Sequence, residues 1–311
     1  MKTLNLDLRA YLRFVAVFVL LVAAILFVPR FSSYANILNL VRHVFLLTLI
    51  AYAVSLSMLV AGLDLSVGSV AALSSCLAAT LISRGNVVLG ILVGLGAGCA
   101  CGFANGFFIT RFRLPDFLMT FSMMFIARGL AMTYTQGSSI FGYPKSFTWI
   151  GKSFVGPIPT CVIISAIVLA LLYFLLNRTT FGRTTYAVGV NKEAARFSGI
   201  DVSRTVMRVY TLGGLLAGLS GLIYIARLGA ADAELGMLWP LDGIAVAVIG
   251  GIAFTGGEGN ILGLILGGIV MAVISNCINL LGLPSRFQDF FLGFMIILAV
   301  TIDHYSKRQT E

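Results

Sequence analysis

The sequence predicts an all-α polytopic membrane protein with about ten transmembrane helices. Two features of its composition support this fold class. Hydrophobic residues make up 59% of the 311 residues and charged residues only 11%, whereas roughly a quarter of the residues in soluble domains are charged. Basic residues give the chain a net charge of +9 and gather at the ends of long apolar runs. This placement is typical of a membrane protein and argues against nucleic-acid binding.

Ten apolar runs, taken in order, are each expected to form one helix. The first lacks a signal-peptide cleavage site and is followed by further apolar runs, so we expect it to remain as a helix. The runs that follow Gly62 and Pro240 are short or ambiguous compared with the ~20 residues that cross a bilayer. The predicted helices cover residues 12–28, 40–61, 65–83, 87–110, 116–135, 160–177, 207–226, 240–254, 260–281 and 287–303.

The distribution of lysine and arginine predicts the orientation of these helices. If the N-terminus is cytoplasmic, thirteen basic residues fall on the cytoplasmic side and seven on the other side. Cytoplasmic loops of membrane proteins carry the excess of lysine and arginine. Both termini are therefore predicted to be cytoplasmic, and the polar, basic stretch at 177–208 becomes a cytoplasmic loop.

One predicted helix carries a glycine at every fourth position. Small residues at this spacing share one helix face and let two backbones approach closely in lipid. Small residues between Gly214 and Gly221 repeat the spacing later in the chain. We expect both sets to be packing surfaces, and the lining of a polar pathway is the alternative. The glycines of the first set are Gly90, Gly94, Gly98, Gly102 and Gly106.

Two short segments resemble each other and suggest a weak inverted repeat. Residues 62–72 and 240–250 each place a Leu-Asp pair beside a glycine or proline that can break a helix. Each segment is followed by an asparagine within a small-residue helix and then by a Leu-Pro pair. The predicted topology places Asp64 and Asp242 at opposite sides of the membrane, as an inverted repeat would.

Five polar residues in and after these segments are candidates for a substrate pathway. Ionisable groups at membrane depth are costly and usually face a partner or a watery cavity. The alternative is a cap on the free N–H groups of the next helix, by Asp64 or Ser66 in the first segment and by Asp242 in the second. Arg128, also within a predicted span, is expected to form a structural ion pair, and extension to the membrane surface is its alternative. The candidates are Asp64, Ser66, Asn105, Asp242 and Asn276.

The chain shows no residue pattern for catalysis, a metal or a cofactor. The Gly-Lys-Ser at 151–153 lacks the earlier glycine of a phosphate-binding loop, and no strand is expected before it. The two histidines and five cysteines do not have the spacing of metal ligands or disulfides. The spans contain too few acidic residues for an ion relay. The chain is therefore not expected to be an enzyme, and its energy source is expected to lie outside it.

The polar loop at 177–208 contains a predicted short helix with signals at both ends. Asn191 is a favourable N-cap, Glu193 suits the positive end of a helix, and Gly199 can adopt the left-handed conformation that ends one. A helix of about two turns is too short to be stable alone, so it needs a surface on which to dock. A plain connector with basic side chains is the alternative.

Five motifs follow one another along the chain: GLDLSVGS at 62–69, NRTTFGR at 177–183, NKEAARFSGI at 191–200, YTLGGLLAGLSGLI at 210–223 and VIGGIAFTGGEGNILG at 248–263. Through these motifs, and over essentially its whole length, the chain resembles the permease subunits of bacterial ATP-binding-cassette (ABC) sugar importers of the ribose, xylose, galactose and autoinducer-2 type. This resemblance implies a single transmembrane permease domain, 1–311, in the bacterial inner membrane. It also implies a second permease subunit, a periplasmic sugar-binding protein, and a cytoplasmic ATPase that binds the ATP and magnesium.

By position, residues 191–199 resemble the coupling helix through which such permeases contact their ATPase. The neighbouring basic residues of the loop lie on the same predicted side of the membrane. The resemblance therefore assigns contact with the ATPase to Asn191, Glu193, Ala194, Ala195, Arg196 and Gly199.

The sequence departs from the common sugar-permease pattern at two places. Phe254 and Thr255 stand where a more polar stretch is common, and Pro240 stands where an acidic residue often precedes Leu-Asp. An ABC permease for branched-chain amino acids or nucleosides is therefore an alternative. A stand-alone secondary transporter, with the polar loop as a connector, is the alternative from another class.

Overall fold

The computed structural model describes residues 2–284 and 286–308, and the ten predicted spans correspond in order to ten of its helices. Their ends differ from the predicted ones by up to six residues, except that the first helix begins much earlier, at Lys2. These helices are α1 (Lys2–Phe27), α2 (Tyr34–Leu59), α3 (Val67–Ser83), α4 (Val87–Arg111), α5 (Asp116–Thr135), α7 (Thr160–Arg178), α10 (Val202–Leu228), α11 (Trp239–Gly250), α12 (Gly263–Leu280) and α13 (Arg286–Arg308).

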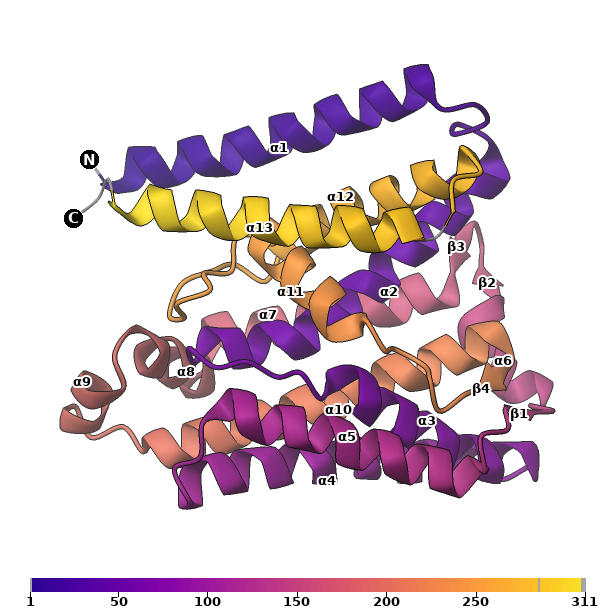
Figure 1. The fold of residues 1–311 in the computed structure, drawn as a ribbon, viewed down its shortest axis with the longest axis horizontal. Helices are drawn as coiled ribbons and strands as arrows, with labels where there is room; N and C mark the ends of the chain where they lie inside the picture. The colour runs from indigo at the N-terminus through magenta and orange to yellow at the C-terminus, as the bar shows by residue number, and fades with distance from the viewer. Residues whose placement is uncertain (1, 285, 309–311) are drawn as a thin grey trace.

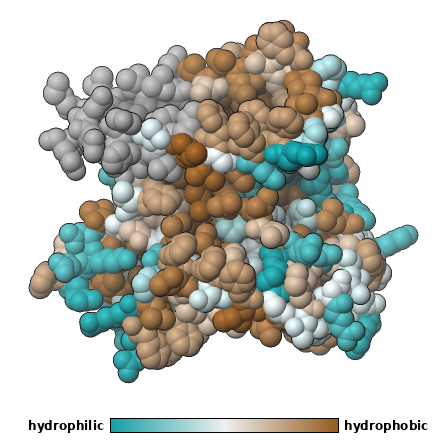
Figure 2. All heavy atoms as spheres, viewed as in Figure 1, coloured by the Kyte–Doolittle hydropathy of each residue, from teal (hydrophilic) through white to brown (hydrophobic). Residues whose placement is uncertain are grey.

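Within the described residues, six helices are long and apolar enough to cross a membrane: α2, α4, α5, α7, α10 and α12. Shorter apolar helices are formed by Phe14–Phe27 of α1, by α3 and by α11. On the face drawn in Figure 2, apolar side chains cover the middle of the molecule and hydrophilic ones gather toward its two ends. The predicted all-α, multi-pass membrane protein is confirmed.

Short elements mark the two ends of the bundle (Figure 1). We name one the α9 end, because α8 (Thr180–Val190) and α9 (Lys192–Phe197) lie there with the start of α1 and the last turns of α13. Since α1 begins and α13 ends at the α9 end, the described part of the chain crosses the bundle an even number of times, as predicted. The opposite end, the β end, carries α6 (Lys145–Lys152) and two antiparallel strand pairs, β1 (Ile140–Phe141) with β4 (Ala230–Ala231), and β2 (Phe154–Val155) with β3 (Ile158–Pro159).

Helix α10 is the central helix and packs against α2, α3 and α4. Its contact with α4 is close because glycines lie in the interface. A methyl group added at Gly98 would lie 2.4 Å from the carbonyl oxygen of Gly214, and one at Gly102 would lie 2.2 Å from that of Tyr210. The predicted packing role of the α4 glycines is confirmed here, since only glycine leaves room for the two backbones.

Two apolar helices, α3 and α11, begin inside the bundle. Each follows a non-helical segment, residues 60–66 before α3 and 229–238 before α11. The starts of the two helices meet, because Gly68 lies so close to Gly236 that an added methyl group would be 1.9 Å from the Gly236 carbonyl oxygen. From this contact α3 runs toward the β end and α11 toward the α9 end (Figure 1). Their opposite directions agree with the predicted inverted arrangement.

The meeting of these helix starts corrects the predicted positions of two aspartates. The predicted topology treated the helices after Asp64 and Asp242 as full spans, which placed the two residues at opposite sides of the membrane. Both residues instead lie within a few positions of the contact between Gly68 and Pro240. The prediction was wrong because the segments that lead into the two helices meet at Gly68 and Gly236 instead of lying at opposite ends of the bundle.

The polar loop predicted at 177–208 is mostly helical. It contains α8, which was not predicted, then α9, and α10 begins at Val202 instead of 207. The residues of α8 include threonines, valines and glycines, which are weak helix formers. Packing holds this helix instead, since Gly189 lies against the Leu59 carbonyl and Gly257, and Gly182 lies against Leu176.

Replacing Gly98 with leucine is expected to force α4 and α10 apart. The new side chain would overlap the Gly214 carbonyl, and overpacking of this kind costs about 1–3 kcal/mol or more. Gly96→Leu is the matched control, because Gly96 lies exposed on the same helix with nothing near an added methyl group. Thermal unfolding of the purified chain in detergent should show a lower Tm for Gly98→Leu only. Equal Tm values would contradict the close helix contact.

Candidate functional site

The predicted short helix at 191–199 is present as α9, and its start is capped as expected. The side-chain oxygen of Asn191 accepts hydrogen bonds from the backbone N–H groups of Glu193 and Ala194, both at 2.9 Å. Glu193 lies in the first turn, where a carboxylate favours the positive end of the helix dipole. Asn191 thus fixes the point at which the chain turns from α8 into α9.

The end of α9 forms a complete Schellman motif. The N–H of Gly199 donates to the Arg196 carbonyl and the N–H of Ile200 donates to the Ala195 carbonyl, both at 3.0 Å. Gly199 has a φ of +79°, a left-handed conformation that costs other residues about 1–2 kcal/mol. The two bonds satisfy carbonyl groups that the helix end would leave free. The predicted stop at Gly199 is therefore confirmed.

Most of the surface of α9 is uncovered. Ala195 is 4% exposed and is the one buried residue of this helix, whereas Phe197 is 90% exposed. Phe197 was not among the predicted contact residues, although an apolar ring in a polar loop is a signal of an interaction surface. Ala195 holds α9 on the bundle, and the other predicted contact residues are exposed: Asn191, Glu193, Ala194, Arg196 and Gly199.

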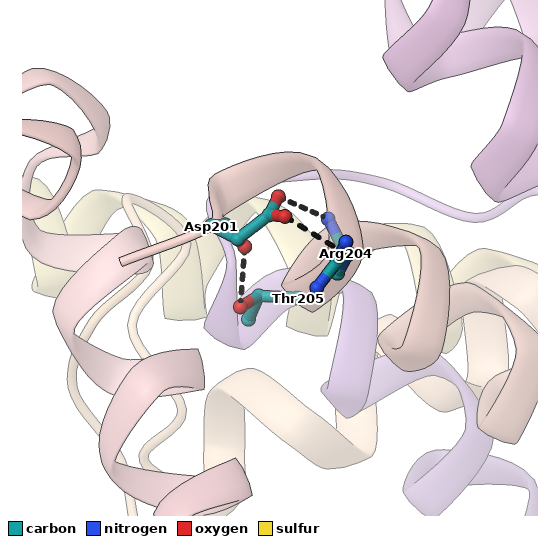
Figure 3. Close-up of polar contacts among 3 residues, drawn as sticks. All are labelled: Asp201, Arg204 and Thr205. Carbon is teal, nitrogen blue, oxygen red and sulfur yellow. Dashed lines mark hydrogen bonds and ion pairs between the residues drawn. The ribbon is translucent and has the colours of Figure 1, made fainter. Parts of the chain in front are cut away.

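Helix α9 is joined to the central helix α10 by four residues, 198–201. The carboxylate of Asp201 accepts a hydrogen bond from the backbone N–H of Arg204 at 2.9 Å and pairs with its Nε at 3.1 Å. The Asp201 carbonyl accepts from the hydroxyl of Thr205 at 2.9 Å. Figure 3 shows these contacts in the first turn of α10. The link between α9 and α10 is therefore short, and its last residue caps the first turn of α10.

Three of the five candidate pathway residues come together at the start of α3. The Asp64 carboxylate accepts from the backbone N–H of Ser66 at 2.8 Å and from its hydroxyl at 2.6 Å. The Asn105 amide of α4 donates to the same hydroxyl at 2.9 Å. All three side chains are buried. The alternative capping role holds only in part, because Ser66 occupies the N-cap position of α3 but makes no side-chain cap bond.

The segment before α3 is held by three side chains that were not predicted from the sequence. Asp116 accepts a hydrogen bond from the N–H of Leu63 at 2.5 Å, and Tyr210 donates to the Leu63 carbonyl at 3.2 Å. The hydroxyl of Thr120 donates to the Leu63 carbonyl and accepts from the N–H of Leu65. Non-helical backbone at membrane depth needs such partners because lipid offers none. These side chains therefore permit the interruption before α3.

The other two candidate pathway residues lie elsewhere. Asn276 on α12 forms a reciprocal pair of hydrogen bonds, at 2.7 and 3.0 Å, with Asn36 near the start of α2. Asp242 lies in the first turn of α11, and Leu238 occupies the N-cap position, so Asp242 does not cap this helix. The five residues thus form one cluster of three and two separate positions.

Backbone carbonyls hold Arg128, and the predicted ion pair is not formed. Its guanidinium donates to the carbonyl of Ala233 and, at 2.8 Å, to that of Leu235. Among the described residues, no carboxylate lies within ion-pair distance of Arg128. The prediction was wrong because the segment before α11 offers free carbonyls close to α5. Arg128 thereby connects α5 to that segment.

The described part of the chain shows no group of side chains that could hold a metal ion. No three histidine, cysteine, aspartate or glutamate side chains gather there closely enough, and the five cysteines are free thiols. The buried polar side chains at the start of α3 instead bind one another.

Comparison with known proteins identifies the family. A family described as "Branched-chain amino acid transport system / permease component" matches residues 36–300. The ribose import permease protein RbsC of Bacillus subtilis (strain 168) is 38% identical over 93% of this chain and 91% of its own. RbsC of Escherichia coli (strain K12) is 35% identical over 93% and 92%, and the D-allose transport system permease protein AlsC of that strain is 37% identical over 79% and 76%. No solved structure matches the chain.

A helical bundle with interrupted spans and a protruding short helix is typical of a membrane transporter. This chain belongs to the family of integral-membrane permease components of ABC importers. It is therefore a transporter subunit, as the motifs indicated.

Removing the Asp64 carboxylate is expected to destabilise the start of α3. In Asp64→Ala the buried N–H of Ser66 loses its acceptor, and an unpaired buried donor costs about 1–3 kcal/mol. In Asp64→Asn the amide oxygen still accepts, so we expect a smaller loss. Thermal unfolding of the two variants in the same detergent measures the difference. A Tm for Asp64→Ala equal to that of the unsubstituted chain would show that the bond is unimportant.

Asp232 supports the β1–β4 pair at the β end. The backbone N–H of Glu234 and the hydroxyl of Ser139 both donate to its carboxylate at 2.7 Å, and these bonds lower the pKa of Asp232. A carboxyl with a lowered pKa stabilises the fold above its ordinary pKa of about 4 and loses this contribution as the pH falls below it. We therefore expect faster hydrogen exchange in residues 140–141 below about pH 4, and less pH dependence in Asp232→Asn. An unchanged pH dependence in this variant would exclude Asp232 as the cause.

Proposed function

We propose that this chain is the membrane permease of an ATP-driven importer for a monosaccharide. The observation that carries this proposal is its similarity to permeases named for ribose and allose, over 93% and 79% of the chain. The family description names branched-chain amino acids, but the GLDLSVGS motif at 62–69 resembles the sugar permeases. A sugar is therefore favoured over an amino acid.

The proposed energy source is a separate cytoplasmic ATPase that docks on α9 and binds the ATP and magnesium itself. Glu193 and Arg196 are exposed and carry opposite charges, and the ring of Phe197 is almost fully exposed. Together these three side chains form a compact docking surface. Apolar rings at the centre of an interface commonly supply much of its binding energy. The caps at Asn191 and Gly199 keep this surface in one conformation while the ATPase moves it.

Helix α10 is proposed to carry this movement to the interrupted spans. It contacts α4 through paired glycines, and its Tyr210 binds the Leu63 carbonyl before α3. A shift of α10 would therefore displace the segment that holds Asp64. Such rigid-body movement of packed helices is a common route to alternating access.

The substrate pathway is proposed to pass the cluster at the start of α3. Asn105 and Ser69 each contribute a buried side-chain oxygen that has no hydrogen-bond partner within the described residues. Buried polar atoms of this kind favour contact with a water or a polar solute, and a sugar presents hydroxyl groups that can donate and accept. Asp242 and Asn276 stay candidates for other points along the pathway.

The remaining assignments follow from the importer family. We propose that the whole chain forms one permease domain in the bacterial inner membrane, with the α9 end and residues 177–208 in the cytoplasm. A second permease subunit, identical or different, would complete the pathway, and a periplasmic sugar-binding protein would dock at the β end.

Substitutions in α9 test the coupling role. Glu193→Lys reverses a charge on the exposed face of α9, and Gly199→Pro cannot adopt the φ of +79° that ends this helix. Both are expected to reduce ATP-dependent uptake at least tenfold in proteoliposomes that contain the partner ATPase and binding protein, while membrane insertion persists. Arg183→Glu is the control, because Arg183 is exposed on α8 and its change also reverses a charge. Normal uptake by both α9 variants would contradict the coupling assignment.

The same proteoliposomes separate the alternatives. Uptake of labelled ribose and of labelled leucine is measured, each with the cognate binding protein. The comparison shows whether the permease transports a sugar or an amino acid. Uptake that continues without ATP and follows an ion gradient would identify a stand-alone secondary transporter.

A further inference from the structure

A groove at the α9 end shares Arg196 with the proposed docking surface of α9, and its other lining residues lie outside that surface. It has a volume of about 700 Å³ and lies between α9, the α4–α5 turn and the start of α10. Four basic side chains line it, two from α9 and two from the end of α4 and the turn that follows. These are Lys192, Arg196, Arg111 and Arg113.

The positive charge of this groove is not neutralised within the described residues. None of the four basic side chains forms an ion pair there, and all four are exposed. The one carboxylate that lines the groove, Asp116, accepts the N–H of Leu63 before α3. Like charges in a concave surface strengthen one another's field and attract anions. The groove therefore favours a ligand with at least one negative charge.

Apolar side chains line another part of the groove. Phe107, Ile109 and Leu114 line it, and Phe107 and Leu114 are 39% and 41% exposed. Phe107 lies about one turn before the end of α4, and this helix is apolar and long enough to span a membrane. The groove thus extends from the basic end of α4 along a helix that can cross a membrane.

We infer that this groove binds an anionic phospholipid of the cytoplasmic leaflet. The phosphate would lie among the four basic side chains, and an acyl chain would lie along Phe107 and Leu114. Basic pockets between the cytoplasmic ends of membrane helices suit such headgroups. An acidic segment of a soluble partner fits less well, because it would leave the exposed apolar side chains of Phe107 and Leu114 uncovered. The inference rests on the proposed function only in placing the α9 end in the cytoplasm.

A bound lipid would connect two parts of the coupling machinery. Lys192 and Arg196 belong to α9, whereas Arg111 and Arg113 belong to α4 and its turn. A phosphate that binds basic side chains of both elements would connect α9 to α4 directly. This connection would add to the one that runs from α9 through α10. The lipid composition of the membrane would then alter how strongly ATPase movement reaches the pathway.

Native mass spectrometry of the full-length chain in detergent tests the site directly. The chain is offered equal amounts of phosphatidylglycerol and phosphatidylcholine of the same acyl composition. We expect the unsubstituted chain to retain phosphatidylglycerol preferentially, and Arg111→Gln/Arg113→Gln to decrease this preference about tenfold. Arg178→Gln/Arg183→Gln is the control, since it removes two exposed arginines near the same end that do not line the groove. The control should keep the preference.

Three outcomes would overturn the inference. The two double variants could lose the preference equally, which would indicate general attraction to basic residues. Inorganic phosphate at millimolar concentration could remove the bound lipid, which would indicate a site for a soluble anion. Arg111→Gln/Arg113→Gln could weaken ATPase binding in the assembled transporter without changing lipid preference, which would indicate a protein interface. Lipid retention is measured on the permease alone, so its result is independent of whether the chain transports a sugar.

Discussion

The close approach of α4 and α10 is the contact on which the other features depend. Without a hydrophobic effect between helices in lipid, their association relies on packing, and glycine allows the densest packing. Helix α10 continues from α9 through four residues, and α4 carries Asn105, which binds Ser66 before α3. A single backbone contact therefore connects the protruding helix to the interrupted span.

Each interruption of a span leaves backbone groups that need new hydrogen-bond partners. Each unpaired backbone group at membrane depth costs several kcal/mol, so a break needs side chains that replace the helical bonds. Asp116, Thr120 and Tyr210 do this for the segment before α3, and Arg128 does it for the segment before α11. These side chains come from α5 and α10, so movement of either helix alters the hydrogen bonds of a break.

The features predicted correctly from the sequence are those that local patterns determine. The apolar runs predicted ten helices in order, and the glycine spacing predicted the close contact of α4. The capping residues Asn191 and Gly199 predicted α9. Features that depend on distant residues were missed. Leu63 is hydrogen-bonded by residues 53 and 147 positions away, and α8 depends on contacts of Gly189 with Leu59 and Gly257. No local pattern indicates such partners.

The exposed ring of α9 favours the proposed coupling helix over a plain connector. Helix caps are common in ordinary helices, so the N-cap and the Schellman motif of α9 do not decide between the two. Phe197 is 90% exposed, and an apolar ring in contact with water is unfavourable. A connector gains nothing from this exposure, whereas a partner that covers the ring removes its cost. The cost of exposing Phe197 therefore argues for a protein partner at α9.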